Sequence, residues 1–214
     1  MPPVNRSWVL GGLLVAAGVG LVRGLTGSRV RLTQNSRILL LGDSMAQGLG
    51  PQIKALATDV RLPYLGYGIP GTRLETWANS QWLDDALTEF QPTMTLVSLG
   101  TNDAYEATPD LWAKKRGAFD ALIAKLQRFS NRYSNDTPDL VYGLGSEIVW
   151  IGPPSLPATH LGMRLNEDFL AELADVAPNY FDSAALEIPR GPDELHPTVK
   201  GFAGWAGAIW QSLT

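Results

Sequence analysis

Three residues of this sequence, Ser44, Asp193 and His196, could together perform nucleophilic chemistry. The chain has no cysteine and only two histidines, His160 and His196, so a thiolate nucleophile is excluded and few general bases remain. Asp193 precedes His196 by three residues. At that spacing a carboxylate can reach Nδ1 of the imidazole and leave Nε2 free to face a serine. The carboxylate would hold the tautomer and stabilise the imidazolium that forms when Ser44 gives up its proton.

Two further residues, Gly71 and Asn102, could stabilise negative charge beside that serine. Gly71 closes a Gly-Ile-Pro-Gly segment, which predicts a loop with an accessible backbone N–H, and Asn102 follows an apolar strand. Together with the N–H of Ser44 they would give three donors to a tetrahedral oxyanion, and loss of one such donor costs about 3 to 4 kcal/mol of barrier. Taken singly, Ser44 and Asn102 are more typical of helix caps and turns, and His196 is more typical of a surface residue at a capped helix start.

The elements that must position these residues alternate between strands and helices. Short apolar runs predict buried parallel strands, and amphipathic spacing predicts helices between them. We expect strands at 38–41, 61–67, 93–99, 147–151 and 180–183, and helices at 45–58, 74–83, 110–133, 160–177 and from Pro197 onward. Residues 140–144 are also strand-like, and the Gly145-Ser146 step separates them from the next strand as a bend, a hairpin or an insertion. Ser44 and Asn102 thereby fall at the carboxyl ends of strands, where open α/β sheets bind ligands.

Composition narrows the class of protein further. The formal net charge of −4 over 214 residues is mild, and neither a basic patch nor an acidic tail is visible, so no nucleic-acid partner is expected. Without cysteine or an HExxH-type motif, the sequence predicts no metal site and no zinc hydrolase. The length allows one domain with a full core plus an appendage.

The appendage is an uncharged run from Trp8 to Val22, flanked by Arg6 and Arg23. Its length of about 15 residues is short for a membrane span and fits the core of a signal peptide better, yet no Ala-x-Ala cleavage site follows. Three alternatives stay open: an uncleaved export anchor, a cleaved signal, or a short apolar helix docked on the domain or on a partner. We therefore expect residues 1–30 to form an anchor or signal segment with a linker, residues 31–214 to form the domain, and the protein to be exported, periplasmic or at the cell surface.

Four short blocks occur in a fixed order along the chain: Gly42-Asp-Ser44-Met45, the loop ending at Gly71, Gly100-x-Asn102-Asp103, and Asp193-x-x-His196-Pro197. They resemble the four blocks of the SGNH hydrolase (GDSL esterase and lipase) superfamily, over about residues 36 to 214. The resemblance implies a three-layer α/β/α sandwich with a mostly parallel, flavodoxin-like sheet. It also implies Ser44 as nucleophile, His196 as base, Asp193 as its orienting acid, the N–H groups of Ser44 and Gly71 and the side chain of Asn102 as oxyanion donors, and no cofactor. Met45 replaces the commoner leucine, which is a near-isosteric apolar change.

The same triad serves several substrates, so the resemblance implies a carboxylic ester hydrolase without naming its ester. Four tryptophans could stack on sugars, line an acyl groove or lie in the core: Trp77, Trp82, Trp112 and Trp150. The export segment favours a small-molecule or polysaccharide ester, above all short acyl groups on a cell-surface glycan or peptidoglycan. The alternatives are a lysophospholipase or acyl thioesterase and, from another class, a non-catalytic membrane-tethered binding protein on the same scaffold.

Overall fold

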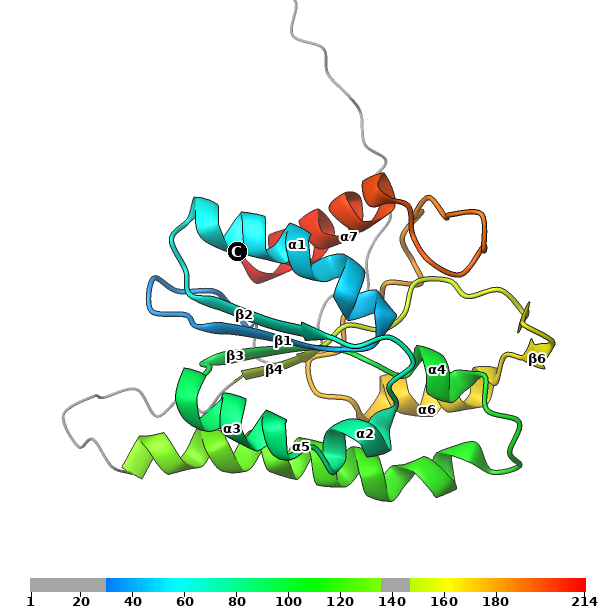
Figure 1. The fold of residues 1–214 in the computed structure, drawn as a ribbon, viewed down its shortest axis with the longest axis horizontal. Helices are drawn as coiled ribbons and strands as arrows, with labels where there is room; N and C mark the ends of the chain where they lie inside the picture. The colour runs from blue at the N-terminus through cyan, green and yellow to red at the C-terminus, as the bar shows by residue number, and fades with distance from the viewer. Residues whose placement is uncertain (1–29, 136–146) are drawn as a thin grey trace, which may run out of the picture.

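A four-stranded parallel sheet forms the centre of the molecule in the computed structural model, which describes residues 30–135 and 147–214 (Figure 1). The strands are β1 (Ile38–Gly42), β2 (Tyr64–Gly68), β3 (Met94–Ser98) and β4 (Glu147–Trp150), in the spatial order β2-β1-β3-β4. This is the order of a flavodoxin-like sheet. The register places Gly42 beside both Gly68 and Ser98. The carboxyl ends of three adjacent strands therefore meet at one edge.

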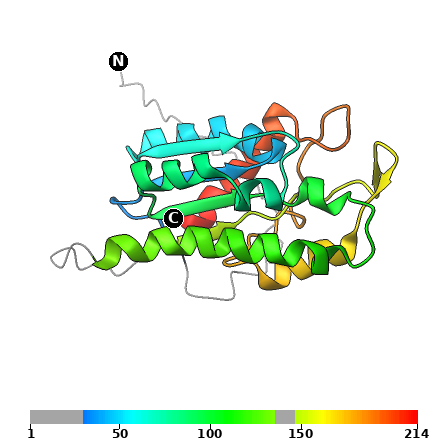
Figure 2. The same cartoon turned by 60° about the horizontal axis from the view of Figure 1, so that its bottom comes forward.

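Helices cover both faces of this sheet and give three layers, as Figures 1 and 2 show. One face carries α1 (Ser44–Asp59) and α7 (Val199–Leu213), and the other carries α2 (Leu74–Ala78), α3 (Gln81–Phe90), α5 (Leu111–Asn135) and α6 (Glu167–Val176). The short α4 (Thr101–Ala104) lies at the carboxyl edge, and β5 (Thr159–His160) and β6 (Met163–Arg164) form a separate small hairpin. The predicted three-layer α/β/α fold is confirmed.

The first strand shows why this sequence forms such a sheet. All five residues of β1 are buried. Ile38 and Leu40 pack in the apolar cluster that includes residues of α1 and α7, whereas Leu39 and Leu41 pack in the cluster on the opposite face. Because successive side chains of a strand point to opposite faces, a strand covered on both sides needs an uninterrupted apolar run.

The segment 160–177 does not form the single helix that its apolar spacing predicted. The hairpin of β5 and β6 turns through Leu161 and Gly162, whose φ angles are 49° and 77°. The helix α6 begins only after Asn166, whose Oδ1 accepts a hydrogen bond from Phe169 N at 2.9 Å. A two-residue turn with positive φ at both positions is typical of a β-hairpin. Turn and cap residues therefore overrode the helical spacing here.

The helix predicted at 74–83 is two helices, α2 and α3. Ser80 separates the two helices, because its side chain accepts a hydrogen bond from Leu83 N at 3.1 Å and caps the start of α3. A serine at this position stabilises a helix start by satisfying a free N–H. The first helix therefore ends at Ala78 and a second begins at Gln81, with Asn79 and Ser80 as the caps between them.

The last predicted strand, 180–183, contributes a single pairing to the sheet. Phe181 forms an isolated parallel bridge with Ile151, just beyond β4. The Phe181 N–H donates to Trp150 O at 2.7 Å, and the Gly152 N–H donates to Phe181 O at 3.0 Å. The chain thus occupies the fifth position of the flavodoxin-like order without forming a full strand.

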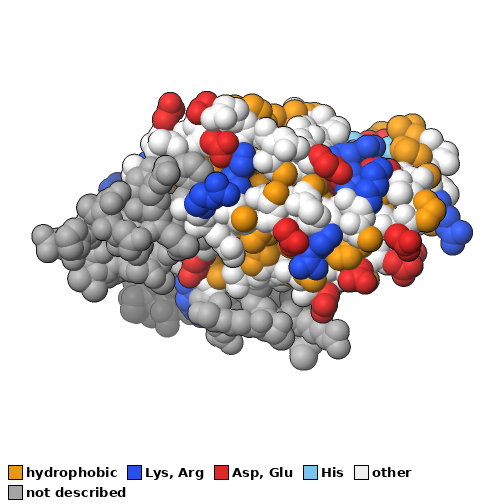
Figure 3. All heavy atoms as spheres, turned by 90° about the horizontal axis from the view of Figure 1, so that it is seen from below, with side chains coloured by type: hydrophobic (Ala, Val, Ile, Leu, Met, Phe, Trp, Pro, Cys, Tyr) orange, Lys and Arg blue, Asp and Glu red, His pale blue; other side chains and the backbone are white. Residues whose placement is uncertain are grey.

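Some predictions concern residues that the structure does not describe. The apolar run Trp8 to Val22, the strand-like segment 140–144 and the Gly145-Ser146 step all lie outside the described residues. Within residues 30–135 and 147–214, no helix combines the length and apolar character needed to cross a membrane. On the face drawn in Figure 3, basic and acidic side chains are interspersed over the surface.

Candidate active site

The turn that carries Ser44 joins the end of β1 to the start of α1. Gly42 has a φ of 152°, and a Cβ at this position would lie 1.8 Å from Ser98 O, so only glycine fits between β1 and β3. Asp43 caps the helix, since its Oδ1 accepts a hydrogen bond from Met45 N at 2.9 Å. Ser44 therefore begins α1 at the carboxyl edge of the sheet, and its side chain is partly exposed.

The imidazole of His196 lies between Ser44 and Asp193. His196 Nε2 is 2.8 Å from Ser44 Oγ, and His196 Nδ1 is 2.5 Å from Asp193 Oδ2. With the proton on Nδ1, Nδ1–H donates to the carboxylate, and Nε2 accepts from the serine hydroxyl. The structure thus brings together the three residues singled out from the sequence, in the order hydroxyl, imidazole, carboxylate.

Asp193 also organises the loop that holds His196. Its Oδ1 accepts hydrogen bonds from Leu195 N at 3.2 Å and from His196 N at 2.9 Å. The side-chain hydrogen bond with His196 is the main cause that lowers the pKa of Asp193 to about 2. The carboxylate is therefore ionised over the neutral and mildly acidic range, although nearly half of its side chain is exposed.

The same loop is closed at its base by Arg190 and Pro197. These two residues form an antiparallel bridge, the Gly191 N–H donates to His196 O at 2.7 Å, and Arg190 Nη1 donates to Leu195 O. Pro197 was expected to be the first residue of the last helix, and this was wrong. Thr198 is the cap instead, and α7 begins after it. Extended backbone at Pro197 is what permits the bridge.

Gly71 and Asn102 lie at the ends of the strands on either side of β1. Gly71 is exposed, with a φ of 77° and open space where a side chain would be. Asn102 lies in the first turn of α4, and its Nδ2 donates to Thr72 O at 3.1 Å. This bond ties Asn102 to the residue that follows Gly71. The three candidate donor residues, Ser44, Gly71 and Asn102, therefore come from the ends of three neighbouring strands.

Sequence reasoning missed three charged residues beneath these loops: Asp43, Asp103 and Lys115. All three are almost wholly buried. Burial raises the pKa of Asp43 to about 7, and it also raises the pKa of Asp103, against the opposing effect of Lys115. Lys115 follows Lys114 in the helix predicted at 110–133, and nothing in that helix suggests that this lysine is buried; its acidic partners on other elements explain its burial.

The four tryptophans have different environments. Trp77 and Trp150 are fully buried in the core, and Trp77 Nε1 donates to Thr72 Oγ1 at 3.0 Å. Trp82 is about a third exposed and contacts Trp77 edge-on. Trp112 packs against Phe119 and Phe169. Core packing thus accounts for Trp77 and Trp150, as the commonest role of a tryptophan would suggest.

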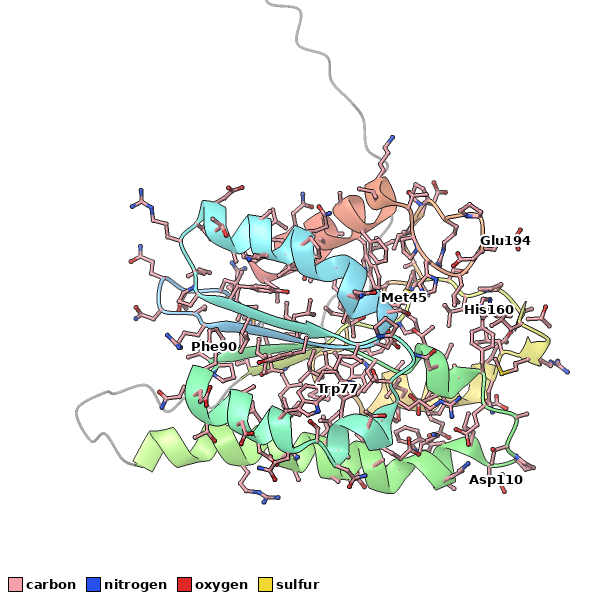
Figure 4. The ribbon with its side chains drawn as sticks, in the orientation of Figure 1. Met45, Trp77, Phe90, Asp110, His160 and Glu194 are labelled. Carbon is pink, nitrogen blue, oxygen red and sulfur yellow. The ribbon has the colours of Figure 1, made fainter. Side chains whose placement is uncertain are left out.

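Figure 4 shows where the site lies in the molecule. Met45, which follows Ser44, and Glu194, which lies inside the Asp193–His196 loop, are both on the side to which the strands point, as is His160. Phe90 lies at the opposite end. Within the part of the chain described, no group of three His, Cys, Asp or Glu side chains is arranged to hold a metal ion.

Known families and structures give the context for this geometry. The profile of a family described as "Protein of unknown function (DUF459)" matches residues 37–174, which is more than half of the chain and includes Ser44, Gly71 and Asn102. None of the curated proteins matches the sequence significantly.

Several solved esterase structures share the fold. Est24, a carbohydrate acetylesterase from Sinorhizobium meliloti, has 17% identity and a TM-score of 0.62 over 83% of this chain and 97% of that one. The acetyl xylan esterase AlAXEase has 16% identity and a TM-score of 0.60 over 83% and 100%. An aryl esterase of M. smegmatis has 15% identity and a TM-score of 0.55 over 84% and 100%. The match to the family profile and this shared architecture agree: the chain belongs to the DUF459 family and has the SGNH hydrolase fold.

Proposed function

We propose that this protein is a serine ester hydrolase that removes acetyl or other short acyl groups from a glycan or peptidoglycan. The observation that carries the proposal is the position of His196, whose two ring nitrogens lie within hydrogen-bond distance of Ser44 Oγ and Asp193 Oδ2. A hydroxyl, an imidazole and a carboxylate in this order form the geometry that activates a serine nucleophile. A helix cap or a surface histidine would need neither contact.

In the first half-reaction, Ser44 Oγ attacks the ester carbonyl carbon while its proton passes to His196 Nε2. The carbonyl oxygen becomes an oxyanion, which accepts hydrogen bonds from the N–H groups of Ser44 and Gly71 and from Asn102 Nδ2. The ionised Asp193 stabilises the imidazolium. When the intermediate collapses, the bond to the alcohol oxygen breaks, His196 returns the proton to that oxygen, and an acyl-serine remains.

In the second half-reaction, water takes the place of the alcohol. The water oxygen attacks the acyl carbon while His196 accepts a proton from the water. The N–H groups of Ser44 and Gly71 and the amide of Asn102 again donate hydrogen bonds to the new oxyanion. Collapse breaks the bond to Ser44 Oγ, which recovers its proton from His196 as the carboxylic acid leaves. Every proton and bond in the cycle is thereby accounted for by Ser44, His196, water and the ester.

Two considerations support a short acyl group on a large carrier. The side chains of His196 and Asp193 are 36% and 46% exposed, so the reacting groups lie near the surface, where an ester on a polymer can approach them. The structural relatives include a carbohydrate acetylesterase and an acetyl xylan esterase. Both considerations favour a short acyl ester on a polysaccharide over a long acyl chain, which a binding groove would have to enclose.

A chain-length series tests the proposal. The full chain, solubilised in mild detergent, should hydrolyse p-nitrophenyl acetate and butyrate and lose activity steeply toward the laurate, and Ser44→Ala should remove all of this turnover. Acetylated xylan and O-acetylated peptidoglycan should then release acetate. A preference for long chains would move the assignment to a lysophospholipase or acyl thioesterase. Full inactivity on every ester would favour the non-catalytic binding protein.

The proposed location is the periplasm or cell surface, with the segment Trp8 to Val22 as anchor or signal. This rests on the apolar character of that segment alone. Fractionation of cells that produce the tagged full chain tests it, with a variant lacking residues 1–30 beside it. An exported protein should be found outside the cytoplasm only when residues 1–30 are present, and a cytoplasmic full chain would refute the proposal.

A further inference from the structure

A buried lysine lies beneath the loops that carry the candidate oxyanion donors. Lys115 projects from α5, and its side chain is only 2% exposed. Its Nζ is 2.8 Å from Glu75 Oε1, 3.1 Å from Asp103 Oδ1 and 2.7 Å from Glu106 Oε2. These carboxylates belong to α2, to α4 and to the turn that follows α4. One cation therefore joins α5 to both segments that begin at Gly71 and Asn102.

Asp103 is the part of this network closest to the candidate donors. It follows Asn102 directly, is fully buried, and accepts a hydrogen bond from Leu74 N at 3.3 Å. Asn102 donates to Thr72 O at 3.1 Å. Asn102 and Asp103 thus hold the segment after Gly71 at two successive points. Asn102 binds it through its amide, and Asp103 binds it through its carboxylate.

The charge on Asp103 depends on Lys115. Burial raises the pKa of Asp103, and Lys115 acts in the opposite direction by charge and by hydrogen bonding. Asp43 is a second buried carboxyl close enough to interact electrostatically with Asp103. Without the lysine, Asp103 would be an uncompensated buried charge, which either takes up a proton or moves toward water. Both responses weaken the bond to Leu74 N.

We propose that Lys115 is a positioning residue of the hydrolase: by compensating Asp103, it fixes the spacing between the Asn102 amide and the Gly71 N–H. The inference rests on the proposed function, because it assigns a role in the same reaction. Lys115 does not touch the substrate. It acts through Asp103 and Leu74 on two groups that have to stand ready before charge develops in the transition state.

Lys125 provides a matched control on the same helix. Its Nζ is 2.9 Å from Asp84 Oδ2 and 2.7 Å from Ser80 O, and its side chain is 14% exposed. It therefore joins α5 to α3 by the same kind of ion pair, without contacting either donor loop. Replacing Lys125 removes an ion-pair link of the same kind, although to one carboxylate instead of three, and leaves the proposed positioning intact.

The test compares Lys115→Met, Lys115→Arg and Lys125→Met in the full chain with p-nitrophenyl acetate. Lys115→Met should lower kcat by about 10- to 100-fold with KM within about threefold, because misplaced donors weaken transition-state binding alone. Lys115→Arg keeps the charge and should recover most of the loss. Lys125→Met should stay within about twofold of the wild-type kcat. A wild-type kcat in Lys115→Met, or an equal loss in Lys125→Met, would overturn the inference.

A double-mutant cycle with Asn102→Ala shows whether Lys115 acts through the donors. If it does, Lys115→Met should lower kcat less in the Asn102→Ala background than in the wild type, because one of the two donors that it positions is already absent. Fully additive effects would contradict the role. Should Lys115→Met fail to fold, Asp103→Asn serves instead, since it keeps the size and one acceptor and leaves Lys115 two other carboxylates. It should lower kcat by about tenfold, and a full rate would count against the inference.

Hydrogen exchange measured by mass spectrometry separates this inference from the proposed function. In Lys115→Met, peptides that cover residues 69–79 and 100–106 should exchange at least about tenfold faster than in Lys125→Met. This readout needs no substrate. If the wild type hydrolyses no ester yet exchange rises as expected, the function fails and the network stands. Ser44-dependent turnover with unchanged exchange and unchanged kcat in Lys115→Met would refute the positioning role alone.

Discussion

His196 Nε2 lies 2.8 Å from Ser44 Oγ, although 152 residues separate the two along the chain. Two parts of the molecule bring them together. The start of α1 holds Ser44 at the end of β1, and the bridge between Arg190 and Pro197 holds the histidine loop just before α7. Because α1 and α7 pack in one cluster on the same face of the sheet, the packing of this layer fixes the distance.

Removing either partner of this contact should abolish hydrolysis. We expect Ser44→Ala and His196→Ala to lower kcat by at least about 10⁴-fold on p-nitrophenyl acetate, with far-ultraviolet circular dichroism unchanged. The control is His160→Ala, which removes the other histidine, a residue that contacts Tyr105, and it should keep full turnover. If His196→Ala retained the wild-type rate, His196 would not be the base.

Asp193 should matter through its charge. Asp193→Asn keeps the acceptor for His196 N but places an amide where Oδ2 faces Nδ1, so the imidazole loses its orienting carboxylate. We expect kcat to fall by about 10³- to 10⁴-fold. Glu194→Gln, which neutralises the neighbouring exposed carboxylate, should leave kcat within about twofold. Steady-state kinetics of the two variants make the comparison, and equal rates would remove Asp193 from the mechanism.

Asn102→Ala should separate catalysis from binding. The side-chain amide would meet the oxyanion only after attack, so its loss should lower kcat by about 10²- to 10³-fold and leave KM nearly unchanged. Asn79→Ala is the control, because Asn79 is exposed at the end of α2, where its Nδ2 donates to Glu75 O. A parallel rise in KM with an unchanged kcat would indicate a role for Asn102 in ground-state binding instead.

The sheet and the site could be predicted because their signals are local. Apolar runs that end in Gly42 and Gly100 mark strands covered on both faces, and the Asp193-x-x-His196 step fixes its own geometry within four residues. The burial of Lys115 could not be predicted in this way. Its three acidic partners lie 9 to 40 residues away, so only the folded chain brings them together.

The hairpin at 159–164 escaped prediction for a different reason. Apolar residues recur at helical spacing through this segment and into α6, so periodicity alone favours a helix. The positive φ angles of Leu161 and Gly162 break it, and positive φ at a leucine is rare enough that no sequence pattern would suggest it. Turn chemistry decided the structure where periodicity was ambiguous.

Asp43 should make stability depend on pH. Its side chain is fully buried, and burial raises its pKa from 3.8 to about 7. Between these two values the folded protein binds one more proton at Asp43 than the unfolded chain does. The stability that the protonated Asp43 contributes to the fold is therefore complete below about pH 4 and is lost as the pH rises through about 7. Asp43→Asn cannot titrate and should lack this loss.

Urea unfolding of the wild type and Asp43→Asn at pH 5 and pH 8 measures the effect. Asparagine keeps the acceptor for Met45 N and is a good helix cap, so the fold should persist. The free energy of unfolding of Asp43→Asn relative to the wild type should be higher at pH 8 than at pH 5 by about 2 kcal/mol. Asp103, whose pKa is also raised, is present in both proteins, so its contribution largely cancels. A difference that stays constant between the two pH values would mean that Asp43 is ionised in the folded protein, with its charge compensated by the N–H groups of the Ser44 turn.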